Sequence, residues 1–148
     1  TLLQAGWREA PPLSPLNAMN WLAPEADIDS LPVLPQVHDG RHQELLMIAP
    51  ATAAKERLIV VRLWKSNREL LDSGQSVWLG KAAYLYLEQD LPLIAYLRTA
   101  PDFQSPLGYL QSTLQQAGNI GMVLRTSPER IARIQWQGRV LLAWETGT

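Results

Sequence analysis

The chain has 148 residues, of which 47% are hydrophobic and 18% charged, enough apolar sequence for one domain with a single core. Thirteen Lys and Arg face fourteen Asp and Glu, a net charge of -1. This balance argues against a nucleic-acid surface or a polybasic membrane patch, since both need clustered positive charge. Cysteine is absent, which excludes disulfides and thiolate sites, and no apolar run approaches the ~18–20 residues of a membrane-spanning helix.

Two helix boundaries are predicted near the start of the chain. Residues 1–7 are typical of the last turns of a helix, which Gly6 closes because glycine adopts the left-handed conformation without steric cost. Ser14 and Pro15 predict a helix start, since a hydroxyl caps free N–H groups and proline suits the first helical position. The apolar stripe of that helix is expected at Leu16, Met19 and Leu22. The Pro- and Asp-rich segment 23–40 is predicted to be an ordered loop held by Leu31, Val33, Leu34 and Val37.

The strongest strand signal is residues 57–64, a β-branched run of the kind that favours extended structure. Residues 75–86 are predicted to be its antiparallel partner, with Gly80 marking a bulge or a close backbone approach. The polar stretch 65–73 between them predicts a loop. Further strands are expected at residues 42–49, 91–97 and 119–125, and as a terminal hairpin of 131–136 with 139–144.

A second helix is predicted from Ser105-Pro106 to Gly118, with its apolar stripe at Leu107, Leu110 and Leu114. Residues 1–148 are therefore expected to form one α+β domain: a largely antiparallel sheet of about six or seven strands with two or three helices on one face. Among the six tryptophans, those in strand-like runs are expected in the core, namely Trp64, Trp78 and Trp144.

Both histidines of the chain lie in one five-residue segment, His38-Asp39-Gly40-Arg41-His42. Two imidazoles and a carboxylate are able to bind a divalent metal. Alternatively, one histidine acts as a base while Arg41 holds a phosphate or carboxylate. The third interpretation is a simple turn, because Asp-Gly is a strong turn pair and His42 then begins a strand.

Arg62 and Trp64 are two residues apart in the strongest strand, so their side chains share a face. With Trp78 on the expected partner strand, the three are predicted to form an Arg–aromatic cluster. The alternative is that Arg62 is semi-buried and satisfied by backbone carbonyls or by an acid such as Asp39. Either interpretation connects Arg62 to the histidine-containing turn.

Four short motifs in this order resemble the LssY C-terminal domain family, over most of residues 1–100. They are Ala5-Gly6-Trp7, then Pro35 and Gly40-Arg41, then Arg62-Leu63-Trp64, and last Val77-Trp78-Leu79-Gly80. The resemblance implies a soluble domain appended to bacterial membrane proteins similar to DedA-type transporters and type-2 phosphatidic acid phosphatases. Many members have a histidine-rich stretch before Arg-x-Trp, where this chain has the apolar residues 58–61.

The resulting hypothesis is a non-catalytic accessory or binding domain of a membrane lipid phosphatase or DedA-type protein. The start at Thr1 suggests a piece of a longer chain, whose membrane-embedded part is the expected partner, together with a lipid head group or small anion. The inner membrane, with the domain on the extracytoplasmic side, is the expected location, and no cofactor is expected. The rival hypothesis is a small, metal-assisted hydrolase acting on a phosphorylated substrate. The candidate ligand-binding residues are His38, Asp39, Arg41, His42, Arg62, Trp64 and Trp78.

Overall fold

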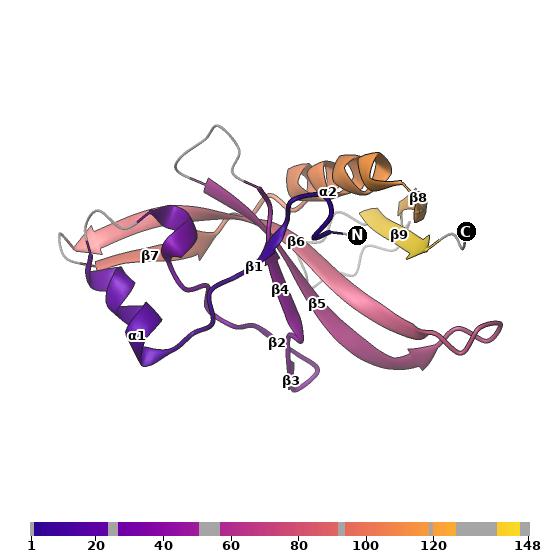
Figure 1. Cartoon of the computed structure of the whole chain (residues 1–148), viewed down its shortest axis with the longest axis horizontal. Coiled ribbons are helices and arrows are strands. Elements are labelled where there is room, and N and C mark those ends of the chain that lie inside the picture. Colours follow the sequence, from indigo (N-terminus) through magenta and orange to yellow (C-terminus); the bar gives the residue numbers. More distant parts are fainter. Residues whose placement is uncertain are drawn as a thin grey trace.

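A five-stranded antiparallel sheet, in the order β1-β4-β5-β6-β7, lies at the centre of the structure (Figure 1). The computed structural model describes residues 2–23, 27–50, 57–91, 94–118, 120–126 and 139–145. The sheet strands are β1 (Arg8–Glu9), β4 (Leu45–Ile48), β5 (Arg57–Glu69), β6 (Ser76–Leu91) and β7 (Ile94–Thr99). Two separate two-stranded ribbons pair β2 (Val37–His38) with β3 (Arg41–His42) and β8 (Ile120–Thr126) with β9 (Arg139–Glu145).

The α+β class and the antiparallel sheet are confirmed, but the described residues contain nine strands, more than the predicted six or seven. Three of the extra strands are only two residues long, too short for a hydrophobic pattern to reveal. The strand expected at 42–49 is interrupted between β3 and β4. Residues 131–136, the first half of the expected terminal hairpin, lie outside the described residues, and β9 pairs with β8.

The long hairpin of β5 and β6 confirms the predicted antiparallel pair, and Figure 1 shows it extending beyond the rest of the sheet. The loop predicted at 65–73 is wrong in its first half, because β5 continues to Glu69 across a bulge. Hydrogen bonds to β6 hold these polar residues in the strand although their side chains are mostly exposed. A Cβ on Gly80 would lie 3.0 Å from Leu63 Cδ2, so the close approach predicted there is confirmed.

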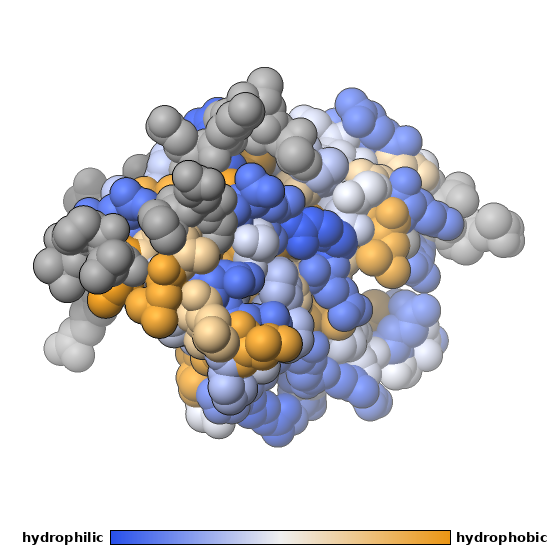
Figure 2. Space-filling model, turned by 60° about the vertical axis from the view of Figure 1, so that its left-hand side comes forward, coloured by the Kyte–Doolittle hydropathy of each residue, from blue (hydrophilic) through white to orange (hydrophobic). Residues whose placement is uncertain are grey.

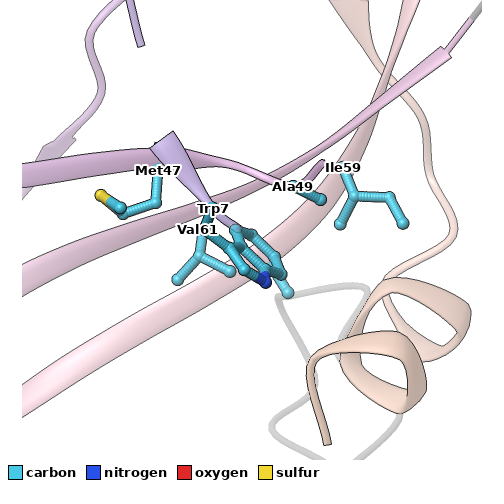
Figure 3. Packing of buried hydrophobic residues seen from close by; sticks show 6 residues of the cluster. Trp7, Met47, Ala49, Ile59 and Val61 are labelled. Atoms are coloured by element: carbon cyan, nitrogen blue, oxygen red, sulfur yellow. The ribbon is translucent and has the colours of Figure 1, made fainter. Parts of the chain in front are cut away.

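Each face of the sheet carries its own core cluster. The helix face is the one with Ile59 and Val61, where α2 (Gln104–Ala117) supplies Tyr109 and Leu110. Figure 3 shows the Trp7 ring among side chains from β4 and β5 on this face. The loop face is the opposite one. Its cluster is Val33, Ile48, Leu58, Val60, Ala83 and Leu85.

The helices are not confined to one face, so that part of the prediction is wrong. The helix α2 covers the helix face, whereas Ile28 of the 3-10 helix η2 (Ile28–Ser30) packs on the loop-face cluster. A chain that crosses the sheet at an edge covers both faces, and residues 28–34 do this with segments too short to show a helical period. Among the described residues, no helix has the length and apolar character needed to cross a membrane.

The helix ends follow their predicted chemistry with one correction. Ser14 Oγ accepts a hydrogen bond from the Asn17 N–H at 3.1 Å and caps α1 (Pro15–Ala18), which continues into the 3-10 helix η1 (Met19–Leu22). At α2, Asp102 and not Ser105 is the cap, because Asp102 Oδ1 accepts from the N–H of Gln104 at 2.9 Å. Gly118 ends α2 with a φ of 69°, as predicted.

Several expected core positions are exposed instead. Trp64 is buried, but Trp78 and Trp144 are about half exposed. Trp144 packs across Gly121 within the β8–β9 ribbon, which is covered on one side only. In the segment 23–40, Leu31 and Val33 are buried as expected, whereas Leu34 and Val37 are exposed. The predicted stripe of α1 also faces solvent, at Leu16, Met19 and Leu22.

Candidate functional site

The candidate site lies on the loop face, where residues 33–38 run along β5. Val33 packs in the cluster with Val60, the Leu34 carbonyl reaches the Arg62 guanidinium, and the His38 ring contacts Trp64. The alternation of β5 places Val60, Arg62 and Trp64 on this same face. The loop therefore covers β5 one position after another, with Arg62 in the middle of the covered stretch.

The β2–β3 hairpin closes the covering segment at one end. Asp39 and Gly40 have φ values of 48° and 76°, as a two-residue type I′ hairpin turn requires. The predicted turn is thus confirmed. His38 pairs with Arg41, and both reach toward β5: the His38 ring centroid is 5.7 Å from that of Trp64, and Arg41 Nη1 donates to the Lys65 carbonyl at 3.5 Å.

The two histidines do not meet. His42 pairs with Val37, so its side chain lies on the opposite face of the hairpin from His38. Asp39 is strongly exposed, and its Oδ2 lies 3.6 Å from His38 Nε2 rather than near Arg62. Within the described ranges, no group of three or more His, Asp or Glu is placed to hold a metal ion. The arrangement that a metal-assisted hydrolase needs from His38, Asp39 and His42 is not formed in the structure.

Arg62 is buried, with 2% of its surface exposed. Its Nη2 donates one long hydrogen bond, 3.5 Å, to the Leu34 carbonyl, while its Nε and Nη1 are buried and have no partner. In the described part of the chain no carboxylate forms an ion pair with it. Burial disfavours the charged form and lowers the pKa of Arg62 from 12.5 to about 10, so the guanidinium remains charged at neutral pH.

Lys81 is the functional residue that sequence reasoning missed. It is the direct cross-strand neighbour of Arg62 on β6, so the two cationic side chains share the loop face. Burial, and secondly the charge of Arg62, lower the pKa of Lys81. Its Nζ lies 4.9 Å from the centroid of the Phe103 ring, a cation–π contact that holds the ammonium beside the loop-face core. Two positive charges therefore lie side by side.

The comparison with protein families covers this whole region. A model described as the LssY C-terminus matches residues 1–88. The chain belongs to the LssY C-terminus family. The matched part of this LssY C-terminus domain runs from β1 into β6 and includes the β2–β3 hairpin, Arg62, Trp64 and Lys81. Comparisons with curated proteins and with solved structures give no match.

Trp78 is not part of the site in this LssY C-terminus domain. It pairs with Lys65, one position beyond Trp64, and therefore lies on the helix face. The predicted cluster thus loses Trp78. The residues that the structure gathers around Arg62 are His38, Arg41, Trp64 and Lys81.

A cleft of about 210 Å³ lies next to the covering segment. Val33 and Pro35 line it from the covering segment, and Glu9 and Glu44 bring the carboxylates. The remaining lining is Ala10, Pro11, Pro12, Leu13, Gln43, Leu45 and Leu46. None of the predicted site residues lines the cleft, whose acidic side chains suit an anion poorly, so the chemistry of the site centres on Arg62 and Lys81.

Proposed function

We propose that this LssY C-terminus domain is a non-catalytic binding module of a larger bacterial membrane protein, and that Arg62 and Lys81 bind a phosphate-bearing group. The observation that carries the proposal is the buried Arg62 guanidinium, which has two nitrogens without an acceptor. A buried charge without a partner is costly, and binding an anion removes that cost.

The ligand class follows from the number and kind of donors. A guanidinium presents a rigid fork that suits two oxygens of one anion, and an ammonium adds a compact charge. The combined charge of Arg62 and Lys81 matches the roughly -1.5 to -2 that a phosphate monoester carries at neutral pH. A single carboxylate would neutralise only one of the two cations, so a phosphate group fits the pair better.

Access to Arg62 is through its neighbours. Lys81 is only partly buried, so its ammonium meets solvent at the edge of the site. The cover over Arg62 and over the start of the exposed hairpin is held by two hydrogen bonds of 3.5 Å, from Arg62 to Leu34 and from Arg41 to Lys65. Bonds of this length are weak, so an incoming anion competes well with them.

A binding role, rather than catalysis, suits the kinds of groups at this site. The side chains around Arg62 are cationic donors and the Trp64 ring, and the nearest imidazole, His38, packs against that ring. The resemblance to appended domains supports the wider proposal: a lipid phosphatase or DedA-type parent in the inner membrane, its membrane-embedded part as partner, and this domain on the extracytoplasmic side. The bound phosphate is then a lipid head group or a free phosphate compound.

Thermal unfolding with inorganic phosphate, glycerol 3-phosphate and a short-chain phosphatidic acid tests the site and separates the two sources. At matched ionic strength, phosphate is expected to raise the Tm of the wild type above its value in chloride. The gain is lost in Arg62→Met and Lys81→Met and kept in Lys65→Met, whose lysine lies on the helix face. A gain that persists in Arg62→Met contradicts the site. Phosphate-ester hydrolysis by the wild type that Arg41→Ala abolishes contradicts the non-catalytic role.

A further inference from the structure

The segment α1–η1 (residues 15–22) presents its apolar side to solvent. Leu16, Met19 and Leu22 are 76%, 63% and 60% exposed, and Leu13 just before them is 48% exposed. The three helical residues are three positions apart, so they lie on one face. Figure 2 shows apolar surface gathered at the end of the molecule that carries α1 and the β6–β7 hairpin.

The polar side of the same segment faces the protein. Asn17 Nδ2 donates to the Pro12 carbonyl at 2.8 Å, and Asn20 Nδ2 donates to the Ser30 carbonyl at 3.1 Å. A helix on the surface of a globular protein normally buries its apolar stripe and exposes its polar one. Here the asparagines attach the helix and the leucines and methionine are left outside, so the orientation is the reverse of the usual one.

The chemistry of this surface is uniform. Residues 10–24 contain no charged side chain, and they include Trp21 beside the exposed leucines. Leucine, methionine and tryptophan without charges are the side chains that enter the boundary between lipid head groups and acyl chains at low cost. Ile94, the first residue of the strand β7 that η1 contacts, is also exposed.

We propose that the face formed by Leu13, Leu16, Met19 and Leu22, the apolar α1 face, docks on a lipid bilayer surface. These four residues expose roughly 500 Å², at the upper end of the patches found on monomers. A stable protein interface needs about 800 Å² from each partner, so the face is too small to hold a second copy. A bilayer requires only that a few apolar side chains enter it, and the neutral segment needs no anionic lipid.

This surface is separate from the Arg62–Lys81 pair, and the inference does not depend on anion binding. It adds to the proposed function a position for the domain: lying against the membrane by α1–η1. Because the apolar side chains are exposed, their replacement leaves the packing of both core clusters untouched.

Flotation with neutral phosphatidylcholine vesicles tests the inference on the 148-residue chain. The wild type is expected to float with the lipid, and the triple variant Leu16→Ser, Met19→Ser, Leu22→Ser to bind at least tenfold more weakly. The matched control is Leu70→Ser with Leu71→Ser, which changes two exposed leucines after the end of β5, and it binds like the wild type. Arg62→Met also binds like the wild type, which separates this surface from the anion site.

Three results would overturn the inference. The wild type fails to float at millimolar lipid, or the triple variant floats as well as the wild type. Alternatively, sedimentation equilibrium without lipid shows a wild-type dimer that the triple variant loses, in which case a second copy covers the face. Circular dichroism verifies that the triple variant is folded. If it is not, the single variant Leu16→Ser takes its place, with a smaller but measurable loss of binding expected.

Discussion

Replacing the buried arginine by methionine, Arg62→Met, is expected to stabilise the domain in the absence of an anion. The pKa of Arg62 falls from 12.5 to about 10, and at 1.36 kcal/mol per unit the folded state carries a penalty of about 3 kcal/mol for keeping the group charged. Methionine fills similar space without charge. Loss of the hydrogen bond to Leu34 offsets about 1 kcal/mol. The free energy of unfolding therefore rises by about 2 kcal/mol.

Urea unfolding followed by tryptophan fluorescence measures this change, and a thermal scan is expected to show a Tm higher by roughly 4–8 °C. The control is Arg41→Met, since Arg41 is exposed and its removal is expected to change the free energy of unfolding by less than about 0.5 kcal/mol. If Arg62→Met instead lowers the free energy of unfolding by more than 1 kcal/mol, the guanidinium is already well satisfied in the folded chain. The reasoning that leads from its free N–H groups to an anion is then refuted.

Three further predictions follow from particular groups. If phosphate binds the wild type with a Kd near 0.5 mM, then 50 mM phosphate adds about 2.7 kcal/mol to its free energy of unfolding, and titration calorimetry shows no binding to Arg62→Met. Because the folded pKa of Arg62 is the lowered one, its penalty is constant below pH 10 and shrinks as pH rises from 10 toward 12.5; urea unfolding from pH 8 to 11 is expected to show the advantage of Arg62→Met declining above pH 10. Gly40→Ala is expected to cost about 1 kcal/mol, since Gly40 has a φ of 76°, whereas Gly108→Ala within α2 adds roughly 0.5–1 kcal/mol; both are measured by urea unfolding.

The parts of the fold that could be predicted are those where one local cause decides the structure. The β-branched run of β5 required burial on both faces, and the glycines at 40 and 118 required a left-handed backbone. Asp39-Gly40 therefore gave the hairpin turn, and Gly118 gave the end of α2. Arg62 and Trp64 share a face in any strand, so their proximity followed from spacing alone.

The position of Lys81 could not be predicted, because it depends on a bulge. Glu69 pairs with Ser76 at the turn, but beyond the irregularity Lys65 pairs with Trp78, a shift of two positions in the sum of paired residue numbers. A regular ladder counted from the turn would have placed Ala83 opposite Arg62. Nothing in the sequence of residues 65–69 shows where the extra residues are accommodated. The same register decides that Trp78 lies on the face opposite Arg62.

The position of α1–η1 could not be predicted for a different reason. Its stripe of Leu16, Met19 and Leu22 is the pattern of a helix that buries those residues, and the pattern was identified correctly. What decides their exposure is that Asn17 and Asn20 find backbone carbonyls at Pro12 and Ser30. Such contacts form between distant segments, and a helical period carries no information about them.

The two departures from ordinary packing have the same explanation. Caps, turns and core strands of this chain agree with their local sequence, so a charge buried at Arg62 and leucines exposed on α1 are not signs of a poorly packed fold. Each lowers the stability of the domain alone, and each is relieved by contact with something outside it: an anion in one case and a bilayer in the other. Natural proteins keep costs of this kind where function needs them. Substitutions at both places are therefore expected to yield a domain that is more stable and more soluble, and that has lost both contacts.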